Sequence, residues 1–267
     1  MLTNLHTHTS FCDGKSTPEE IVLFAIDKGF SSIGFSGHAT TPFDLSYCMK
    51  DTEGYISEIK RVRDKYGRKI QIYLGIEEDM YSTVDRDRFD YIIGSSHYIF
   101  KDGKYYSVDS GTKYIQRCLE AFNSDVLALA DSYYNSFCDY ITERKPDIVG
   151  HFDLITKFDE ALEVPLFLEN KEYLALSEKY IRYAAKTPVI FEVNTGAMAR
   201  GVRKTPYPYE NLLFTLKKCD AKITLSSDSH SADTLDYCFK EASAMLRDIG
   251  FTHRYVLSDG KFVPDRL

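Results

Sequence analysis

Residues 5–14 read LHTHTSFCDG and place two histidines, His6 and His8, two positions apart at the end of an apolar run. Side chains at positions i and i+2 of an extended strand lie on the same face, so both imidazoles point in one direction. Two imidazoles on one face provide half of the ligands of a typical zinc site. By itself such a pair could also be two surface histidines on an edge strand, so the rest of the chain has to distinguish the two cases.

The same arrangement, an apolar run that ends at a polar residue, recurs along the chain. Seven runs are predicted to be strands: Leu2–His8, Ser32–Ser36, Lys69–Ile76, Tyr91–Ser95, Asp147–Gly150, Val189–Val193 and Lys222–Ser226. Between them, helical periodicity predicts the helices Pro18–Lys28, Thr52–Tyr66, Thr112–Phe122, Asp125–Arg144, Glu169–Lys186 and Ala232–Ile249. Alternating strands and helices favour a parallel sheet, and functional residues at the C-terminal ends of successive strands are typical of a β/α barrel. The sequence therefore predicts an α/β barrel of seven strands.

Local signals support these boundaries and indicate one domain. Thr17 and Glu20 have the spacing of a capping box before the first helix, Pro18 fits its first turn, and Gly29 ends it. Residues 82–90, 100–111 and 198–209 are predicted to be loops, and no repeat or flexible linker divides the chain. We therefore predict a single domain over residues 1–267.

The composition excludes several classes of protein. A net charge of -7 without a basic stripe is atypical of a nucleic-acid binder. No apolar stretch approaches the ~20 residues of a membrane span, and the N-terminus does not resemble a signal peptide. The six cysteines are scattered without a C-x-x-C motif, which is typical of a reduced, cytoplasmic protein. These features predict a small-molecule partner and leave the oligomeric state open.

Nine residues near the predicted strand ends have side chains that bind metals. They are His6, His8, Asp13, His38, Glu77, His97, His151, Asp228 and His230. One zinc ion takes three or four protein ligands, so nine ligands are too many for one metal and fit three if one carboxylate bridges. Single residues also have other interpretations, because Asp228 could cap the helix predicted from Ala232 and Glu77 could belong to a solvated acidic run. Their joint position at strand ends favours a metal centre.

The order of these motifs resembles the polymerase and histidinol phosphatase (PHP) superfamily. The matching motifs span nearly the whole chain: Leu5–Thr9, Asp13-Gly14, Gly37-His38, Gly75–Glu77, Gly94–His97, Gly150-His151 and Ser227–His230. Residues 150–158, which read GHFDLITKF, are similar to the histidinol-phosphate phosphatase branch, as are residues 192–195 and Tyr207-Pro208. The resemblance implies a distorted, PHP-like (β/α)7 barrel with a trinuclear metal centre and its active site at the C-terminal ends of the strands.

The resemblance also implies which residues bind each metal. One metal would take His6, His8, Glu77 and Asp228, a second Glu77, His97 and His151, and a third Asp13, His38 and His230. The chain departs from many relatives by having Gly37 before the histidine, and some members have a histidine near the position of Asp13. Zinc, manganese and iron all accept such ligands.

The reaction implied by the resemblance is hydrolysis of L-histidinol phosphate to L-histidinol and phosphate, a step of histidine biosynthesis. A hydroxide that bridges two metals would attack phosphorus, with Asp228 accepting its proton and Glu77 and His230 as further catalytic candidates. The alternative is a PHP phosphoesterase that acts on nucleotides or small phosphodiesters. An accessory domain of a polymerase is a third class, which the complete set of nine ligands disfavours.

The substrate contacts are predicted from charge and side-chain type. Residues 199–204, ARGVRK, form a compact basic cluster near a predicted strand end, and Arg200 and Arg203 would hold the phosphate through bidentate hydrogen bonds. Asp153, Asp109 and Tyr207 are candidates for the amino and imidazole groups. The basic cluster could alternatively be a solvated loop.

Overall fold

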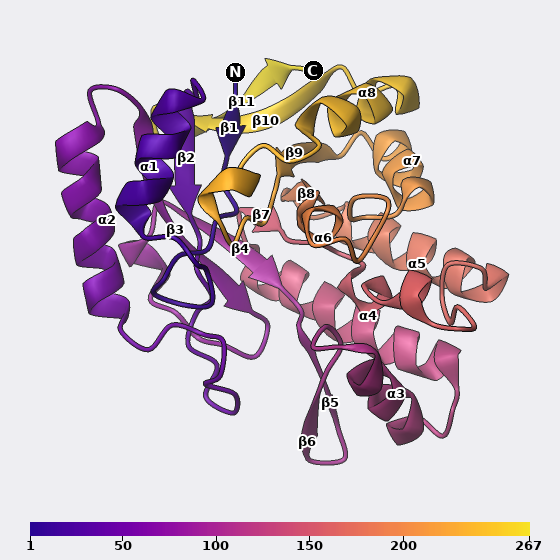
Figure 1. The fold of residues 1–267 in the computed structure, drawn as a ribbon. Helices are drawn as coiled ribbons and strands as arrows, with labels where there is room; N and C mark the ends of the chain where they lie inside the picture. The colour runs from indigo at the N-terminus through magenta and orange to yellow at the C-terminus, as the bar shows by residue number, and fades with distance from the viewer.

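Seven parallel strands form a barrel in the computed structural model, which describes all 267 residues (Figure 1). Their order around the sheet is β1 (Thr3–Asn4), β2 (Ser32–Phe35), β3 (Gln71–Asp79), β4 (Tyr91–Ser95), β7 (Ile148–Val149), β8 (Ile190–Asn194) and β9 (Lys222–Ser226). A parallel bridge between Thr7 and Ser229 joins the segments that follow the first and the last strand. The backbone N–H of His8 donates to Ser229 O at 2.8 Å, and that of Ser229 donates to His6 O at 3.1 Å. The prediction of a seven-stranded β/α barrel is confirmed.

Helices connect the strands and cover the outside of the barrel (Figure 1). They are α1 (Pro18–Asp27), α2 (Thr52–Tyr66), α3 (Thr112–Ala121), α4 (Val126–Arg144), α5 (Lys171–Ala184), α6 (Gly196–Ala199), α7 (Glu210–Lys218) and α8 (Phe239–Ile249). The predicted capping box is present, because the Thr17 side chain accepts from the backbone N–H of Glu20 while the Glu20 carboxylate accepts from that of Thr17. None of the helices is both long enough and apolar enough to span a bilayer.

The interior of the barrel is filled by apolar and aromatic side chains. Tyr91 is fully buried there and packs over Gly75, where an added Cβ would lie 2.3 Å from the Tyr91 ring. The glycine is therefore required for this packing. At the N-terminal ends of the strands the hairpin β10 (His253–Ser258) and β11 (Lys261–Arg266) inserts Leu257 into the same cluster. The hairpin therefore covers this end of the barrel.

Two predictions of secondary structure were wrong. The segment 100–111, predicted to be a loop, includes most of the hairpin formed by β5 (Tyr98–Lys101) and β6 (Lys104–Ser107). Its turn is Asp102-Gly103, both with positive φ, a sequence that favours tight hairpins. The helix predicted over Ala232–Ile249 is interrupted: a 3₁₀ turn covers Ala232–Thr234, and α8 begins only at Phe239.

The interruption of this helix has a local cause. The Thr234 hydroxyl donates to Ser231 O at 3.0 Å and lies 2.8 Å from the Ser229 hydroxyl. Such bonds compete with helical hydrogen bonds, and Cys238 adopts a positive φ before the helix starts. Neither α7 nor the hairpin β10–β11 is among the predicted elements.

Candidate metal centre

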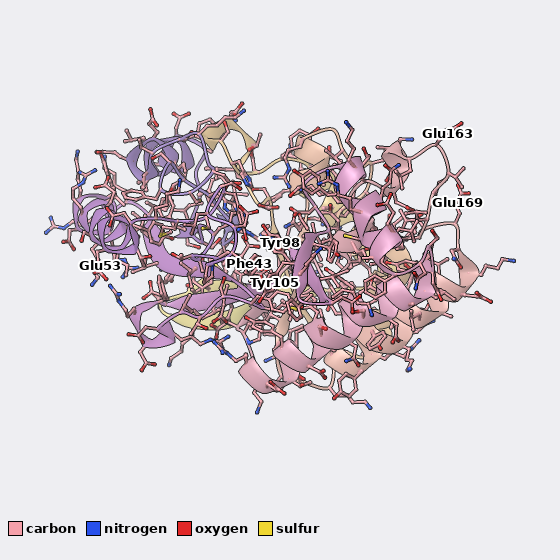
Figure 2. All side chains as sticks on the ribbon, turned by 90° about the horizontal axis from the view of Figure 1, so that it is seen from below. Phe43, Glu53, Tyr98, Tyr105, Glu163 and Glu169 are labelled. Atoms are coloured by element: carbon pink, nitrogen blue, oxygen red, sulfur yellow. The ribbon has the colours of Figure 1, made fainter.

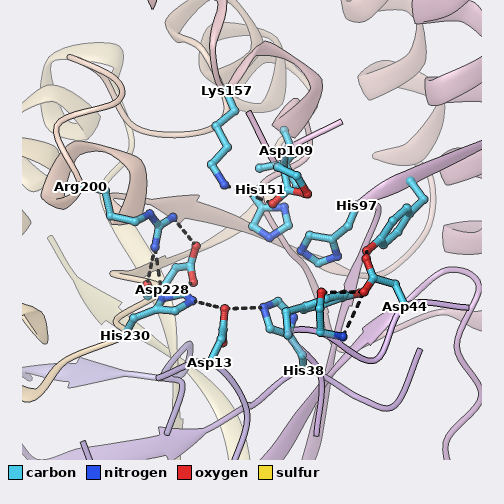
Figure 3. A pocket seen from close by; sticks show the side chains of 15 residues that line it. Asp13, His38, Asp44, His97, Asp109, His151, Lys157, Arg200, Asp228 and His230 are labelled. Atoms are coloured by element: carbon cyan, nitrogen blue, oxygen red, sulfur yellow. Dashed lines mark hydrogen bonds and ion pairs between the residues drawn. The ribbon is translucent and has the colours of Figure 1, made fainter. Parts of the chain in front are cut away.

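The nine predicted ligands lie together at the C-terminal end of the barrel, and Figure 3 shows the six of them that line the pocket above it. They come from the ends of the strands or the loops that follow, except Glu77, which lies inside β3 because this strand continues to Asp79. Their donor atoms form four overlapping groups: His6, Glu77 and His151; His6, His8 and Asp228; His38, Glu77 and His97; His8, Asp13, His38 and His230.

The most buried group has the spacing of a metal site. His6 Nε2 lies 3.4 Å from Glu77 Oε2 and 3.7 Å from Asp228 Oδ1, and His8 Nε2 lies 3.6 Å and 3.1 Å from the same two atoms. Ligand atoms bound at about 2.1 Å to a tetrahedral ion are about 3.4 Å apart. His6 Nε2, His8 Nε2 and Glu77 Oε2 are buried and have no hydrogen-bond partner. Buried polar atoms are rarely left unpaired, so these residues fit a bound cation.

Glu77 connects this group to a second one. Its Oε2 faces His6 and His8, while its Oε1 lies 3.0 Å from His151 Nε2 and 3.5 Å from His97 Nε2. A carboxylate whose two oxygens face different imidazole pairs has the geometry of a bridge between two metals. Ser95 Oγ donates to the same Oε1 at 2.6 Å and fixes the orientation of the carboxylate.

The third group is more open. His230 Nε2 lies 3.2 Å from Asp13 Oδ2, and His38 Nε2 lies 3.8 Å from the same oxygen. The other nitrogen of His38 is 2.8 Å from Glu77 Oε2, so its ring stands between the third group and the bridge. One third of the Asp13 side chain is exposed, whereas Glu77 is fully buried.

Two carboxylates that the sequence analysis did not assign support the ligand histidines from behind. Glu192 accepts from His6 Nδ1 at 2.6 Å and from the backbone N–H of His151 at 2.8 Å. Asp79 accepts from the backbone N–H of His97 at 2.8 Å and lies 3.1 Å from its Nδ1. Such partners fix the tautomer and ring orientation of a metal-binding histidine. A signal was available in each case, because an acid inside a buried strand requires a buried partner.

Burial and the charges of neighbouring groups have opposite effects on the pKa values of several histidines in the centre. Burial disfavours the imidazolium form of His97, but Glu77 and Asp79 more than offset it and raise the pKa of His97 to about 9. In the same way, nearby carboxylates overcome burial and hold the pKa of His6 well above its ordinary value. Burial and the neighbouring imidazoles lower the pKa of His8 to about 3. The centre therefore consists of ionised carboxylates that attract cations, either protons or metal ions.

A pocket of about 300 Å³ opens above the three groups. Of the predicted substrate contacts, Arg200 and Asp109 line it, and Lys157, which we had not assigned a role, lines it as well (Figure 3). Arg200 Nη2 lies 3.1 Å from Asp228 Oδ2, and Lys157 Nζ lies 3.1 Å from Asp109 Oδ2. Of the two arginines in the basic cluster of residues 199–204, only Arg200 therefore lines the pocket.

The other three predicted contacts lie behind the pocket wall. Arg203 and Asp153 are buried, 3.8 Å apart, and the Arg203 guanidinium lies 4.2 Å from the centre of the Tyr207 ring. Arg203 also donates to Thr156 Oγ1 at 2.9 Å. None of these three side chains lines the pocket, so they act as a packed support for the segment that follows His151. Sequence alone does not distinguish a buried arginine–aspartate pair from a ligand-binding one.

Comparison with known proteins places this arrangement in a family. The model of the PHP domain matches residues 4–196. A protein of Schizosaccharomyces pombe named "Probable histidinol-phosphatase" is 28% identical over 96% of this chain and 89% of its own length. The histidinol-phosphatase of Lactococcus lactis is 26% identical over 93% of this chain and 90% of its own length.

A crystal structure has the same fold. It is that of histidinol phosphate phosphatase from Lactococcus lactis, in complex with zinc, L-histidinol and phosphate. It superposes with a TM-score of 0.75 and 21% identity, over 98% of each chain. At this level of identity the superposition establishes the fold.

Proposed function

Because the chain belongs to the PHP domain family, we infer that it is a metal-dependent phosphomonoesterase that hydrolyses L-histidinol phosphate to L-histidinol and phosphate. The relatives named histidinol-phosphatase align over nearly the full length of the chain. The reaction belongs to histidine biosynthesis. We propose that one domain carries it, since strands from Thr3 to Ser226 share a single sheet.

One observation carries the proposal: nine histidine and carboxylate side chains converge in four overlapping groups below a pocket that also contains two cationic side chains. A phosphate monoester brings two negative charges, and such a pocket can accept them. Nucleotides and small phosphodiesters are the alternative substrates. They are less favoured because the full-length relatives are named for histidinol phosphate.

We propose that these nine residues hold three divalent metal ions. His6, His8, Glu77 and Asp228 would hold the first, Glu77, His97 and His151 the second, and Asp13, His38 and His230 the third. Zinc fits these ligands, as do manganese and iron. Bound divalent metals supply Lewis acidity and lower the pKa of water towards ~7, which makes a nucleophile available at neutral pH.

The residues around the centre have separate tasks in this proposal. Asp228 presents Oδ1 to His6 and His8 and Oδ2 to Arg200, so it can orient the attacking water and accept its proton at Oδ2. The guanidinium of Arg200 has further N–H donors for the phosphate oxygens. Lys157 brings a second positive charge to the pocket.

The test is phosphate release from a panel of substrates. The panel contains L-histidinol phosphate, nucleoside monophosphates and bis-p-nitrophenyl phosphate, each assayed with the metal-loaded protein. We expect kcat/KM to be at least tenfold higher for histidinol phosphate than for the others. Faster turnover of nucleotides or of the diester would refute the substrate assignment. Metal analysis of the same sample tests the metal content, since fewer than two metals per chain would refute a trinuclear centre.

A further inference from the structure

One carboxylate in the pocket wall has no part in the metal centre and no basic partner. Four aspartates line the pocket. Asp13 and Asp228 belong to the proposed ligand groups, and Asp109 is paired with Lys157 at 3.1 Å. The fourth is Asp44, and no lysine, arginine or histidine is among the groups that stabilise its charge. An unpaired carboxylate is therefore available to a ligand in the pocket.

The structure holds this carboxylate in a fixed orientation. Asp44 Oδ1 accepts from the backbone N–H of Ser46 at 3.0 Å and from Ser46 Oγ at 2.6 Å, and Oδ2 accepts from the Tyr98 hydroxyl at 2.8 Å. Partial burial acts to raise the pKa of Asp44, but these donors outweigh it and lower the pKa. The group is thus ionised at neutral pH and already positioned before a ligand arrives, which reduces the ordering cost of binding.

Two tyrosines, Tyr47 and Tyr98, line the pocket beside Asp44, and further rings pack behind Tyr98. The Phe43 and Tyr98 rings are 4.9 Å apart, and Tyr105 stacks on Phe43 at 3.6 Å (Figure 2). The Tyr47 ring lies 4.7 Å from the ring of the candidate ligand His38. Aromatic faces attract cations, and the attraction grows when water is excluded. The wall beside Asp44 therefore favours a positively charged group.

Besides the ion pairs Arg200–Asp228 and Lys157–Asp109, the pocket has a cationic and an anionic side chain on opposite sides. Arg200 lies on one side and Asp44 on the opposite side, with His38 and His97 between them (Figure 3). A ligand with an anionic and a cationic end could place its phosphate near Arg200 and the centre, and its cation towards Asp44.

We propose that Asp44 binds the ammonium group of the substrate and selects phosphate monoesters that carry an amine on the alkyl chain. The inference rests on the proposed function, because L-histidinol phosphate has its amine on the carbon beside the phosphorylated one. Asp44 is a specificity-determining residue in this assignment. It contacts the part of the substrate that does not react, so its loss acts mainly on KM.

The experiment removes the charge from the enzyme and the amine from the substrate. Wild-type protein, Asp44→Asn and Asp44→Ser are assayed with L-histidinol phosphate and with 3-(imidazol-4-yl)propyl phosphate, which lacks the amine. p-Nitrophenyl phosphate serves as the substrate that reports an intact metal centre. Asp102→Asn is the matched control, because Asp102 lies in the turn of the neighbouring hairpin with its side chain 79% exposed, and asparagine tolerates its positive φ.

A hydrogen bond between charged groups corresponds to about a 10- to 100-fold effect. Wild-type protein should prefer the amine-bearing substrate by about this factor, mostly through KM. Both Asp44 variants should lose that preference while hydrolysing p-nitrophenyl phosphate normally, and Asp102→Asn should keep it. The serine variant is included because an asparagine amide would face the donors of Ser46 or Tyr98.

The two levels of the inference fail in different ways. Wild-type protein that hydrolyses histidinol phosphate well but shows no preference for the amine would overturn the role of Asp44 and leave the proposed function intact. An undiminished preference in either folded variant would do the same. Wild-type protein that hydrolyses p-nitrophenyl phosphate but not histidinol phosphate would overturn the proposed function itself.

Discussion

Replacing Glu192 by glutamine should weaken metal binding although no candidate metal ligand is mutated. The carboxylate accepts four hydrogen bonds: from His6 Nδ1 at 2.6 Å and Ser226 Oγ on one oxygen, and from the backbone N–H of His151 at 2.8 Å and Asn194 Nδ2 at 3.0 Å on the other. Glutamine offers one accepting oxygen and one donating amide group. Whichever way it turns, the amide nitrogen faces two donors.

The magnitude follows from the bonds lost. A hydrogen bond to a charged group contributes about 1.5–3 kcal/mol, and removing a carboxylate behind a ligand histidine typically costs 10–100-fold in metal affinity. The hydrogen-bond energy and the loss of metal affinity agree, because a tenfold change in affinity corresponds to about 1.4 kcal/mol. We therefore expect Glu192→Gln to bind zinc about 10- to 100-fold more weakly at the cluster that contains His6.

The assay is competition between metal-free protein and a chromophoric chelator, so it does not depend on activity. Glu78→Gln provides the control. Glu78 is likewise a buried acid, in β3, but its carboxylate pairs with Arg86, Arg144 and the Tyr140 hydroxyl instead of a candidate ligand. The Glu78→Gln substitution should lower thermal stability and leave zinc affinity unchanged. Equal zinc affinity in Glu192→Gln and wild type, or an equal loss in the control, would refute the role of Glu192.

Three other predictions follow from the same geometry. Asp228→Asn should lower kcat for histidinol phosphate by at least 100-fold, about 2.7 kcal/mol in the barrier, and near-normal turnover in a metal-loaded variant would exclude it as proton acceptor. Zinc added to metal-free protein at pH 7.5 should release protons, because a pKa of about 9 keeps the His97 ring protonated until a metal displaces the proton, and the pKa of His6 is shifted in the same direction. Apparent zinc affinity should therefore fall as the pH is lowered, and a titration in weak buffer with phenol red that shows no release would contradict the charge balance. Gly75→Ala should destabilise the fold by about 1–3 kcal/mol, since its Cβ would lie 2.3 Å from the Tyr91 ring. An unchanged thermal midpoint would show that the barrel interior is not tightly packed.

The strands and the nine candidate ligands could be predicted because their signals are local. Lys222–Ser226 and Tyr91–Ser95 match the predicted strands, since each is a short apolar run bounded by polar residues. Histidine and carboxylate at successive strand ends identified the metal candidates before any distance was available. Parallel strands bring those ends to one side of the sheet, so position along the chain was enough.

What could not be predicted depends on partners that are distant in sequence. Glu192 acquires its task only because β8 lies where it can reach His6 and His151. Arg203 and Arg200 are three positions apart, yet one is buried against Asp153 and the other lines the pocket. Asp44 is not among the predicted substrate contacts, because nothing in its local sequence shows that the Tyr98 hydroxyl completes its hydrogen bonds.

The two kinds of carboxylate in this site explain how one pocket can both hold metals and select a substrate. Glu77 and Asp228 are buried among imidazoles, and their neighbours keep their pKa values well below the ordinary range although burial acts in the opposite direction. Such buried charge is stable only with a cation beside it, which the proposed metals would supply together with Arg200. Asp44 is partly solvated and held by neutral donors, so it can lose a ligand at little cost. The difference in burial therefore separates a permanent cation site from an exchangeable one, and a turnover cycle needs both.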